Sequence, residues 1–101
     1  MEKDLRYTEL FELYQGLLTE RQREIFSCHY CLDLSLAEIA EPDGNTRQSV
    51  YAVIKTVKDK LDEYEQKLNM YAKNQKLIEV AKEIEGANSD VANKILDIVG
   101  R

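Results

Sequence analysis

The chain has 101 residues, 44% of them hydrophobic, which is enough for one small domain with a modest core. Charged residues make up 33%, and the net charge of −5 argues against a general nucleic-acid binder, whose surface is usually basic. No apolar run approaches the roughly 20 residues of a membrane span, and the first six residues lack the apolar stretch of a secretory signal, so we expect a cytoplasmic protein without membrane contact.

The charge is unevenly distributed along the chain. Residues 1–45 carry four Lys or Arg against ten Asp or Glu, and residues 61–101 carry six against eight. Residues 46–60 reverse the balance, with four basic residues against one acidic residue. One short basic segment therefore stands out in an acidic protein.

The first two predicted helices follow from apolar spacing and capping signals. A helix over about residues 3–16 is indicated by apolar residues at three- and four-residue spacing, namely Leu5, Phe11, Tyr14, Leu17 and Leu18. Thr19 with Gln22 three residues later is typical of a capping box and predicts a second helix to about residue 31. Its predicted inward residues are Ile25, Phe26 and Tyr30.

Near the end of the second predicted helix stand Cys28, His29 and Cys31. Zinc is usually held by four ligands, and the chain has no other Cys or His. A redox Cys-x-x-Cys would stand after a strand at a helix start, whereas this one stands late in a helix. We therefore expect two buried cysteines and an exposed histidine, with no metal site and no cofactor.

A short third helix and a tight turn come next. Ser35 with Glu38 repeats the capping signal, and Pro42 predicts an end of regular structure near Ala40 or Glu41, because the residue before proline is pushed out of the helical region. Pro42-Asp43-Gly44-Asn45 is rich in turn formers.

The last long helix is predicted to start at Thr46 or Asn45 and to run for roughly 40 residues, or about 60 Å, since neither Gly nor Pro occurs between Gly44 and Gly86. A heptad-like stripe runs along it: Ile54, Val57, Leu61, Tyr64, Leu68, Tyr71 and Ile78. A closing helix begins at Ser89-Asp90, with four inward residues: Val91, Ile95, Leu96 and Val99. Either the closing helix or a second chain covers the distal stripe. We expect a homodimer, or another partner, to contact Leu61, Tyr64, Leu68, Tyr71 and Ile78.

Residues 35–58 have the pattern of a helix-turn-helix, in which a first helix braces a second whose exposed face enters the major groove. Ala40 is small enough for a close crossing, Gly44 suits the turn, and Val50 with Ile54 supplies inner anchors. The residues expected to reach nucleic acid are Thr46, Arg47, Gln48, Ser49, Lys55 and Lys58. An ordinary solvated helix surface, balanced by nearby acidic residues, explains the same side chains, and for the lysines we prefer that explanation.

Two segments, Leu17-Leu18-Thr19-Glu20-Arg21-Gln22-Arg23-Glu24-Ile25-Phe26 and Leu34-Ser35-Leu36-Ala37-Glu38-Ile39-Ala40, resemble region four of bacterial sigma factors. Over about residues 5–72 the chain more closely resembles the YlxM-like family of helix-turn-helix proteins, whose second-helix motif is similar to Thr46-Arg47-Gln48-Ser49-Val50-Tyr51 and is followed by a long helix similar to residues 61–68. The resemblance implies an all-α, sigma-region-four-like fold, with a helix-turn-helix domain over residues 1–60 and a helical extension over 61–101. It also implies a regulatory role in the signal recognition particle pathway.

The chain departs from this family at the turn, where Pro42, Asp43 and Asn45 stand at or beside positions that are apolar in relatives. Burying Asp43 unpaired would cost several kcal/mol, so we expect it to be exposed and the turn to be splayed. Two functions remain open: docking on a protein or ribonucleoprotein of the signal recognition particle pathway, and sequence-specific DNA binding. We do not expect an enzyme, because the sequence shows neither a Gly-rich phosphate loop nor a nucleophile–base pairing.

Overall fold

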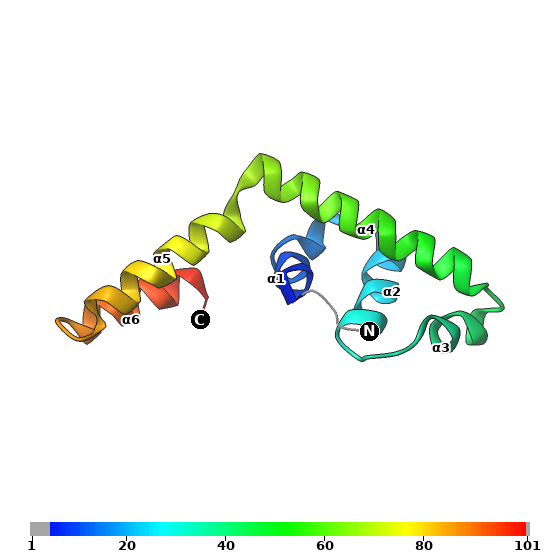
Figure 1. Ribbon diagram of the computed structural model, residues 1–101, viewed down its shortest axis with the longest axis horizontal. Coiled ribbons are helices and arrows are strands. Elements are labelled where there is room, and N and C mark those ends of the chain that lie inside the picture. The colour runs from blue at the N-terminus through cyan, green and yellow to red at the C-terminus, as the bar shows by residue number, and fades with distance from the viewer. Residues whose placement is uncertain (1–4, 101) are drawn as a thin grey trace. The chain divides into compact units, whose positions relative to one another are not determined.

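The computed structural model describes residues 5–100. Within that range it contains no strand and has six α-helices (Figure 1): α1 Leu5–Tyr14, α2 Glu20–Tyr30, α3 Leu36–Ala40, α4 Arg47–Leu68, α5 Met70–Glu85 and α6 Ser89–Val99. Two short 3-10 helices, η1 Gln15–Leu17 and η2 Glu41–Asp43, follow α1 and α3. The all-α helix-turn-helix fold is confirmed. The chain forms two compact units, Met1–Lys67 and Leu68–Arg101.

Both predicted capping boxes are present. The Gln22 backbone N–H donates to Thr19 Oγ1 over 3.2 Å, and the Thr19 N–H donates to Gln22 Oε1 over 3.0 Å. At α3, Ser35 and Glu38 make the same pair of bonds, both at 3.1 Å. These bonds satisfy backbone donors that a helix start leaves unpaired, and each cap stabilises its helix by about 1 kcal/mol.

The core of the first unit is built from apolar side chains of α1, α2, α3 and α4 together with Leu18. Its largest fully buried members are Phe26, Leu10, Leu61, Val50 and Val57. Phe26 stacks on Tyr30 with ring centroids 4.3 Å apart and lies 4.9 Å from the Phe11 ring. The aromatic cluster therefore joins α1 to α2, and the predicted inward face of α2 is confirmed.

The predicted inward face of the first helix is partly wrong. Leu5 and Leu17 are 77% and 56% exposed, whereas Leu10, absent from the prediction, is completely buried. Leu5 is the first residue of α1, and the two residues that the prediction places before it lie outside the described residues. Leu17 belongs to η1, whose 3-10 periodicity turns it away from the face on which an α-helix would have placed it.

Polar contacts fasten α1 to the later turns of α4. Tyr7 Oη donates to Asp62 Oδ2 over 2.7 Å, and Arg6 bonds the other oxygen of Asp62 over 2.9 Å. Tyr14 Oη donates to Glu65 Oε1 over 2.7 Å, with both side chains buried. Because hydrogen bonds to carboxylates are short and directional, these tyrosines orient α1 as well as packing it.

The prediction of one uninterrupted helix of about 40 residues is wrong. Helix α4 ends at Leu68 and a new helix, α5, starts at Met70, because Asn69 between them has a left-handed backbone with φ of 56°. Asn is one of the few residues other than Gly that tolerate this conformation, so neither Gly nor Pro was needed to break the helix. The 22 residues of α4 span about 33 Å rather than about 60 Å.

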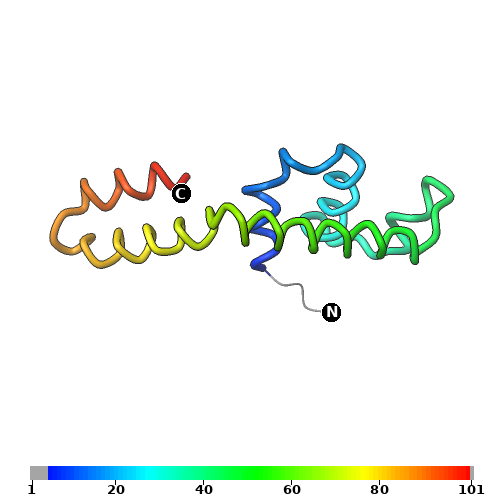
Figure 2. Tube along the Cα trace, turned by 90° about the horizontal axis from the view of Figure 1, so that it is seen from above, coloured from blue at the N-terminus to red at the C-terminus, as the bar shows by residue number. Residues whose placement is uncertain are grey.

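In the second unit α5 and α6 form an antiparallel hairpin (Figure 2). The side chain of Asn88 accepts from the Val91 N–H over 3.2 Å, so Asn88 caps α6 and the prediction of a cap at Ser89 is one residue late. Ala81 and Ala92 are the two buried residues described in this unit. Such small side chains allow the two helices to approach closely. Val91, predicted inward, is 40% exposed.

Candidate nucleic-acid interface

The helix-turn-helix consists of α3, η2 and α4, and its turn is closed by backbone hydrogen bonds. The Asn45 N–H donates to the carbonyl of Ala40 over 3.0 Å, and the Gly44 N–H donates to that of Glu41 over 3.2 Å. Gly44 has φ of 66°, the left-handed conformation that glycine adopts without penalty. Ala40 is 3% exposed, as expected for the small residue at the helix crossing.

α3 ends at Ala40, as Pro42 predicts, and these hydrogen bonds close the turn locally, while the splaying of the helix pair stays a prediction. Glu41, before the proline, keeps helical angles (φ −57°, ψ −49°), so the expected push out of the helical region does not occur. Pro42 stands at the start of η2, where a missing N–H and a fixed φ are tolerated. Asp43 is exposed, as expected. Main-chain bonds therefore close this turn.

The start of α4 is fixed by Thr46. Thr46 Oγ1 accepts from the Ser49 N–H over 3.0 Å, and Ser49 Oγ donates back to the Thr46 carbonyl over 3.2 Å. On the inner side, Val50 is fully buried and Ile54 is 4% exposed, which confirms both as anchors. Thr46 and Ser49 thus lie at the predicted interface, but their hydroxyl groups already serve the helix start.

On the outer side of α4, four exposed side chains form what we call the α4 outer face: Arg47, Gln48, Tyr51 and Lys55. Arg47, Tyr51 and Lys55 follow at intervals of four residues and share one side of the helix. Tyr51, which was not among the predicted contacts, is 57% exposed, and its position four residues from both Arg47 and Lys55 could have indicated it. Lys55 Nζ lies 3.6 Å from Asp59, an exposed ion pair that contributes little.

Lys58 does not belong to this face. Its ammonium group lies 5.3 Å from the ring centroid of Tyr7 and 5.4 Å from that of Tyr30, and the residue is only partly exposed. A cation between two aromatic rings is held by their negative faces and has lost part of its water. The structure therefore uses Lys58 inside the first unit, and we remove it from the proposed nucleic-acid contacts.

The residues predicted for a dimer or partner interface are divided between the two units. Leu61 is completely buried by its own chain, and Tyr64 is partly buried, with its hydroxyl donating to the Leu17 carbonyl over 3.3 Å. Leu68 is 47% exposed, while Tyr71 and Ile78 are partly exposed on α5. Since Leu61 has no free surface, it cannot belong to an interface in this conformation.

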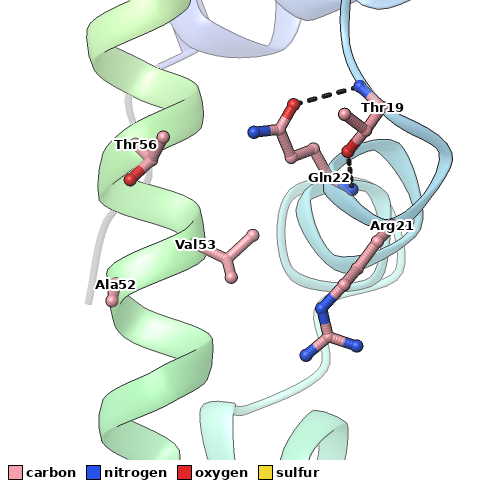
Figure 3. A pocket seen from close by; sticks show the side chains of 6 residues that line it. All are labelled: Thr19, Arg21, Gln22, Ala52, Val53 and Thr56. Carbon is pink, nitrogen blue, oxygen red and sulfur yellow. Dashed lines mark hydrogen bonds between the residues drawn. The ribbon is translucent and has the colours of Figure 1, made fainter.

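A cavity of about 320 Å³ opens between α2 and α4, close to the first turn of α2 (Figure 3). It is lined by Thr19, Arg21, Gln22, Ala52, Val53 and Thr56. Figure 3 shows Val53 pointing from α4 toward α2, and it shows the two bonds that already engage Thr19 and Gln22 in the helix cap. The lining offers an apolar wall and a few polar groups, without a carboxylate, thiol or imidazole for acid–base chemistry.

The cysteines lie at the end of α2, and their predicted burial is wrong. Cys31 is exposed because it is the C-cap after the last helical residue, and Cys28 is partly exposed. His29, predicted exposed, is part-buried and places Nδ1 2.8 Å from the Leu34 carbonyl. Within residues 5–100, no three His, Cys, Asp or Glu side chains gather as metal ligands would.

None of the helices in the described range is long and apolar enough to cross a membrane. Around the turn the surface is acidic, because Glu38, Glu41 and Asp43 are all exposed. The pKa of the Glu38 carboxyl lies below its ordinary value of 4.5, mainly because it accepts the Ser35 backbone N–H and also bonds the Ser35 side chain. This group therefore stays ionised at neutral pH beside the helix-turn-helix.

Comparison with known proteins gives one consistent result. Residues 1–99 match the profile of the family UPF0122, described as "Putative helix-turn-helix protein, YlxM / p13 like". A UPF0122 protein of Halalkalibacterium halodurans is 45% identical over 87 residues, covering 86% of this chain and 80% of that protein. Similar proteins occur in Symbiobacterium thermophilum, 43% identical over 81% of this chain and 77% of that protein, and in Bacillus cereus, 39% identical over 98% and 93%. The family is described by its helix-turn-helix, not by an enzymatic activity, and the chain belongs to this YlxM/p13-like family.

Proposed function

We propose that this protein is a non-enzymatic regulator that binds duplex DNA with the α4 outer face. One observation carries the proposal: Val50 and Ile54 are buried while Arg47, Gln48 and Tyr51 are exposed over the same turns of α4. In a helix-turn-helix the early, outward residues of the second helix are the ones that reach base edges. A helix anchored on its inner side and closed by a hydrogen-bonded turn presents those residues in a fixed direction.

Each residue of the α4 outer face has a chemistry that suits the major groove. The guanidinium group of Arg47 can donate two hydrogen bonds to the O6 and N7 atoms of guanine, and the amide of Gln48 can pair with adenine. The ring of Tyr51 offers an apolar surface for a thymine methyl group, and Lys55 offers a charge for phosphate. The face therefore combines base-reading and phosphate-binding groups within about two helical turns.

Binding through so few cations has a measurable signature. With Arg47 and Lys55 as the cations of the face, the logarithm of the association constant should fall against the logarithm of salt concentration with a slope of about −2. The acidic residues beside the turn repel phosphate and reduce the affinity further. Specific contacts to bases must then supply much of the binding free energy.

The test is a fluorescence anisotropy titration of the purified protein with sheared duplex DNA at several salt concentrations. Arg47→Glu should weaken binding at least tenfold and flatten the salt dependence, because it removes a cation of the interface and adds a repulsive charge. Lys67→Glu makes the same change in net charge near the other end of α4 and should leave binding nearly intact. Equal losses in both variants would mean that only overall charge matters, and unchanged binding by Arg47→Glu would exclude the α4 outer face.

A second candidate function is docking on a protein or ribonucleoprotein of the signal recognition particle pathway. The observation that favours it is the acidic surface beside the turn, where Glu38, Glu41 and Asp43 are exposed and where bound DNA would bring phosphate close. A partner with a basic surface fits this charge better than naked DNA does. Under this proposal the helix-turn-helix would serve as a scaffold for protein contact.

A pull-down from a bacterial lysate, divided into nuclease-treated and untreated halves, distinguishes the two candidates. Components of the signal recognition particle that remain bound after nuclease treatment, and that Arg47→Glu also retains, would support protein docking. An eluate that is emptied both by nuclease treatment and by Arg47→Glu would contradict protein docking and support nucleic-acid binding.

A further inference from the structure

The hairpin of α5 and α6 carries an uncovered apolar face. Leu77, Val80 and Ile84 form a stripe at i, i+3 and i+7 on α5, and Val91, Ile95 and Ile98 form one at i, i+4 and i+7 on α6. Taking Ala81 and Ala92 as the residues that face each other, the helical geometry of an antiparallel pair places both stripes on the same side of the hairpin. We call these six residues the hairpin face.

Four residues of the hairpin face are exposed in the single chain, and Ile84 and Ile95 are partly buried. Leu77, Val80 and Val91 are 38%, 44% and 40% exposed, and Ile98 is 80% exposed. Among the described residues of the second unit, those that are fully buried are two alanines, so one layer of two helices leaves most of its larger apolar side chains in contact with water. Helices with an apolar stripe are stable when a further layer covers that stripe.

The charges on α5 indicate what the covering layer is. Residues 70–78 contain Lys73 and Lys76 and no acidic residue, whereas residues 79–85 contain three glutamates against one lysine. This order opposes the helix dipole, which favours acidic residues at the start and basic residues at the end. Within residues 5–100, Lys73, Lys76, Glu79 and Glu83 form no ion pair.

An antiparallel second α5 complements this charge order. A two-fold axis passing between Leu77 and Val80 brings Lys73 and Lys76 close to Glu83 of the second copy, and the reverse on the other side. A two-fold interface requires a patch that is complementary to itself, and a helix with one positive and one negative half meets that requirement. Two hairpins joined in this way form a four-helix bundle with the hairpin faces inside.

We infer that a second copy of this chain covers the hairpin face, with the two α5 helices antiparallel about residues 77–80. The dimer goes beyond the proposed DNA binding and does not depend on it, because none of its residues belongs to the α4 outer face. It also replaces the interface expected from the heptad stripe, since Leu61 is buried in the first unit. The surface that joins two copies is the side of the hairpin that carries Val80 and Ile98.

Light scattering on the full-length protein after gel filtration tests the inference. The expected mass is twice 11.7 kDa. Val80→Glu with Ile98→Glu should shift the mass to that of one chain, because buried charges oppose association. Leu32→Glu, a matched control at a residue that is 65% exposed in the first unit, should leave the dimer intact. A mass of one chain for the unaltered protein up to about 1 mM would overturn the inference.

Charge reversal tests the antiparallel arrangement even if the glutamate variants lose helix content. Lys73→Glu with Lys76→Glu makes both halves of α5 net acidic, and Glu79→Lys with Glu83→Lys makes both halves net basic, so each double variant should dimerise about tenfold more weakly. A mixture of the two variants should recover a mass of two chains, because an acidic α5 then meets a basic one. If the charge reversals and the changes at Val80 and Ile98 all leave dimerisation unchanged, the dimer interface lies on another surface. If the unaltered protein instead co-elutes from a lysate with a different protein as a one-to-one complex and never self-associates, that result would contradict the inference that a second copy covers the hairpin face.

Discussion

At the scale of single residues, the contacts of Lys58 join three helices of the first unit. Its ammonium group lies over Tyr7 of α1 and Tyr30 of α2, at 5.3 and 5.4 Å from their ring centroids. These contacts bring side chains of α1, α2 and α4 together at one point. The neighbouring Lys55 has only the exposed partner Asp59.

Replacing Lys58 should therefore affect stability, while replacing Lys55 should affect binding. We expect Lys58→Met to lower the free energy of unfolding by about 0.5–2 kcal/mol, since methionine keeps the apolar stem but loses the cation between two rings. Lys55→Met should change it by less than about 1 kcal/mol, because an exposed ion pair contributes little. Urea denaturation of both variants measures the difference, and equal effects would contradict the assigned role of Lys58.

At the scale of secondary-structure elements, α3 depends on its cap because it has only five residues. Bonds from Ser35 hold the pKa of Glu38 below its ordinary value of 4.5. A carboxyl group whose pKa is lower in the folded than in the unfolded protein contributes stability that is present above the unfolded pKa and is lost as pH falls through the folded pKa. The start of the helix-turn-helix should therefore weaken in acid.

The acid sensitivity of the cap can be measured with Glu38→Gln. Glutamine keeps an oxygen that accepts the Ser35 N–H but does not titrate, so the wild type should lose stability relative to this variant as pH falls below about 4.5. Urea unfolding of both proteins between neutral pH and pH of about 3.5 gives the comparison, in which other titrating groups cancel. A stability difference that stays constant across this range would show that the ionised form of Glu38 adds nothing to the stability of the fold.

The elements differ in how well local sequence predicts them. The caps at Thr19 and Ser35 were predictable because both partners stand three residues apart in the chain. The break at Asn69 was not, because the side-chain pattern continues through it and only the backbone angle reveals it. The end of α3 at Ala40 and the turn after it were predictable from Pro42 and Gly44, whereas the helical backbone angles of Glu41, before the proline, were not.

The candidate site shows the same limit. Arg47 and Gln48 were predictable as exposed residues at the start of the second helix, and Tyr51 follows from them by helical spacing. The position of Lys58 between Tyr7 and Tyr30 depends on residues about 50 and 28 positions away in the sequence, which no local pattern contains. Long-range packing therefore decides which cations of the basic segment remain available to a partner.

At the scale of the whole molecule, the chain separates its two proposed tasks between its two units. The first unit, Met1–Lys67, contains a core of its own and holds the α4 outer face. The second unit, Leu68–Arg101, buries little and exposes the hairpin face. A dimer formed through the second unit would carry two copies of the helix-turn-helix, which matches the two-fold symmetry of many DNA sites.

Selection from a pool of randomised DNA duplexes tests recognition by the α4 outer face. We expect the wild-type protein and Lys67→Glu to enrich the same short sequence motif over successive rounds. Arg47→Glu should lose that motif, and Gln48→Ala should relax the preference at one or two of its positions. A pool that stays random with the wild-type protein, or a motif that survives Arg47→Glu unchanged, would contradict recognition by this face.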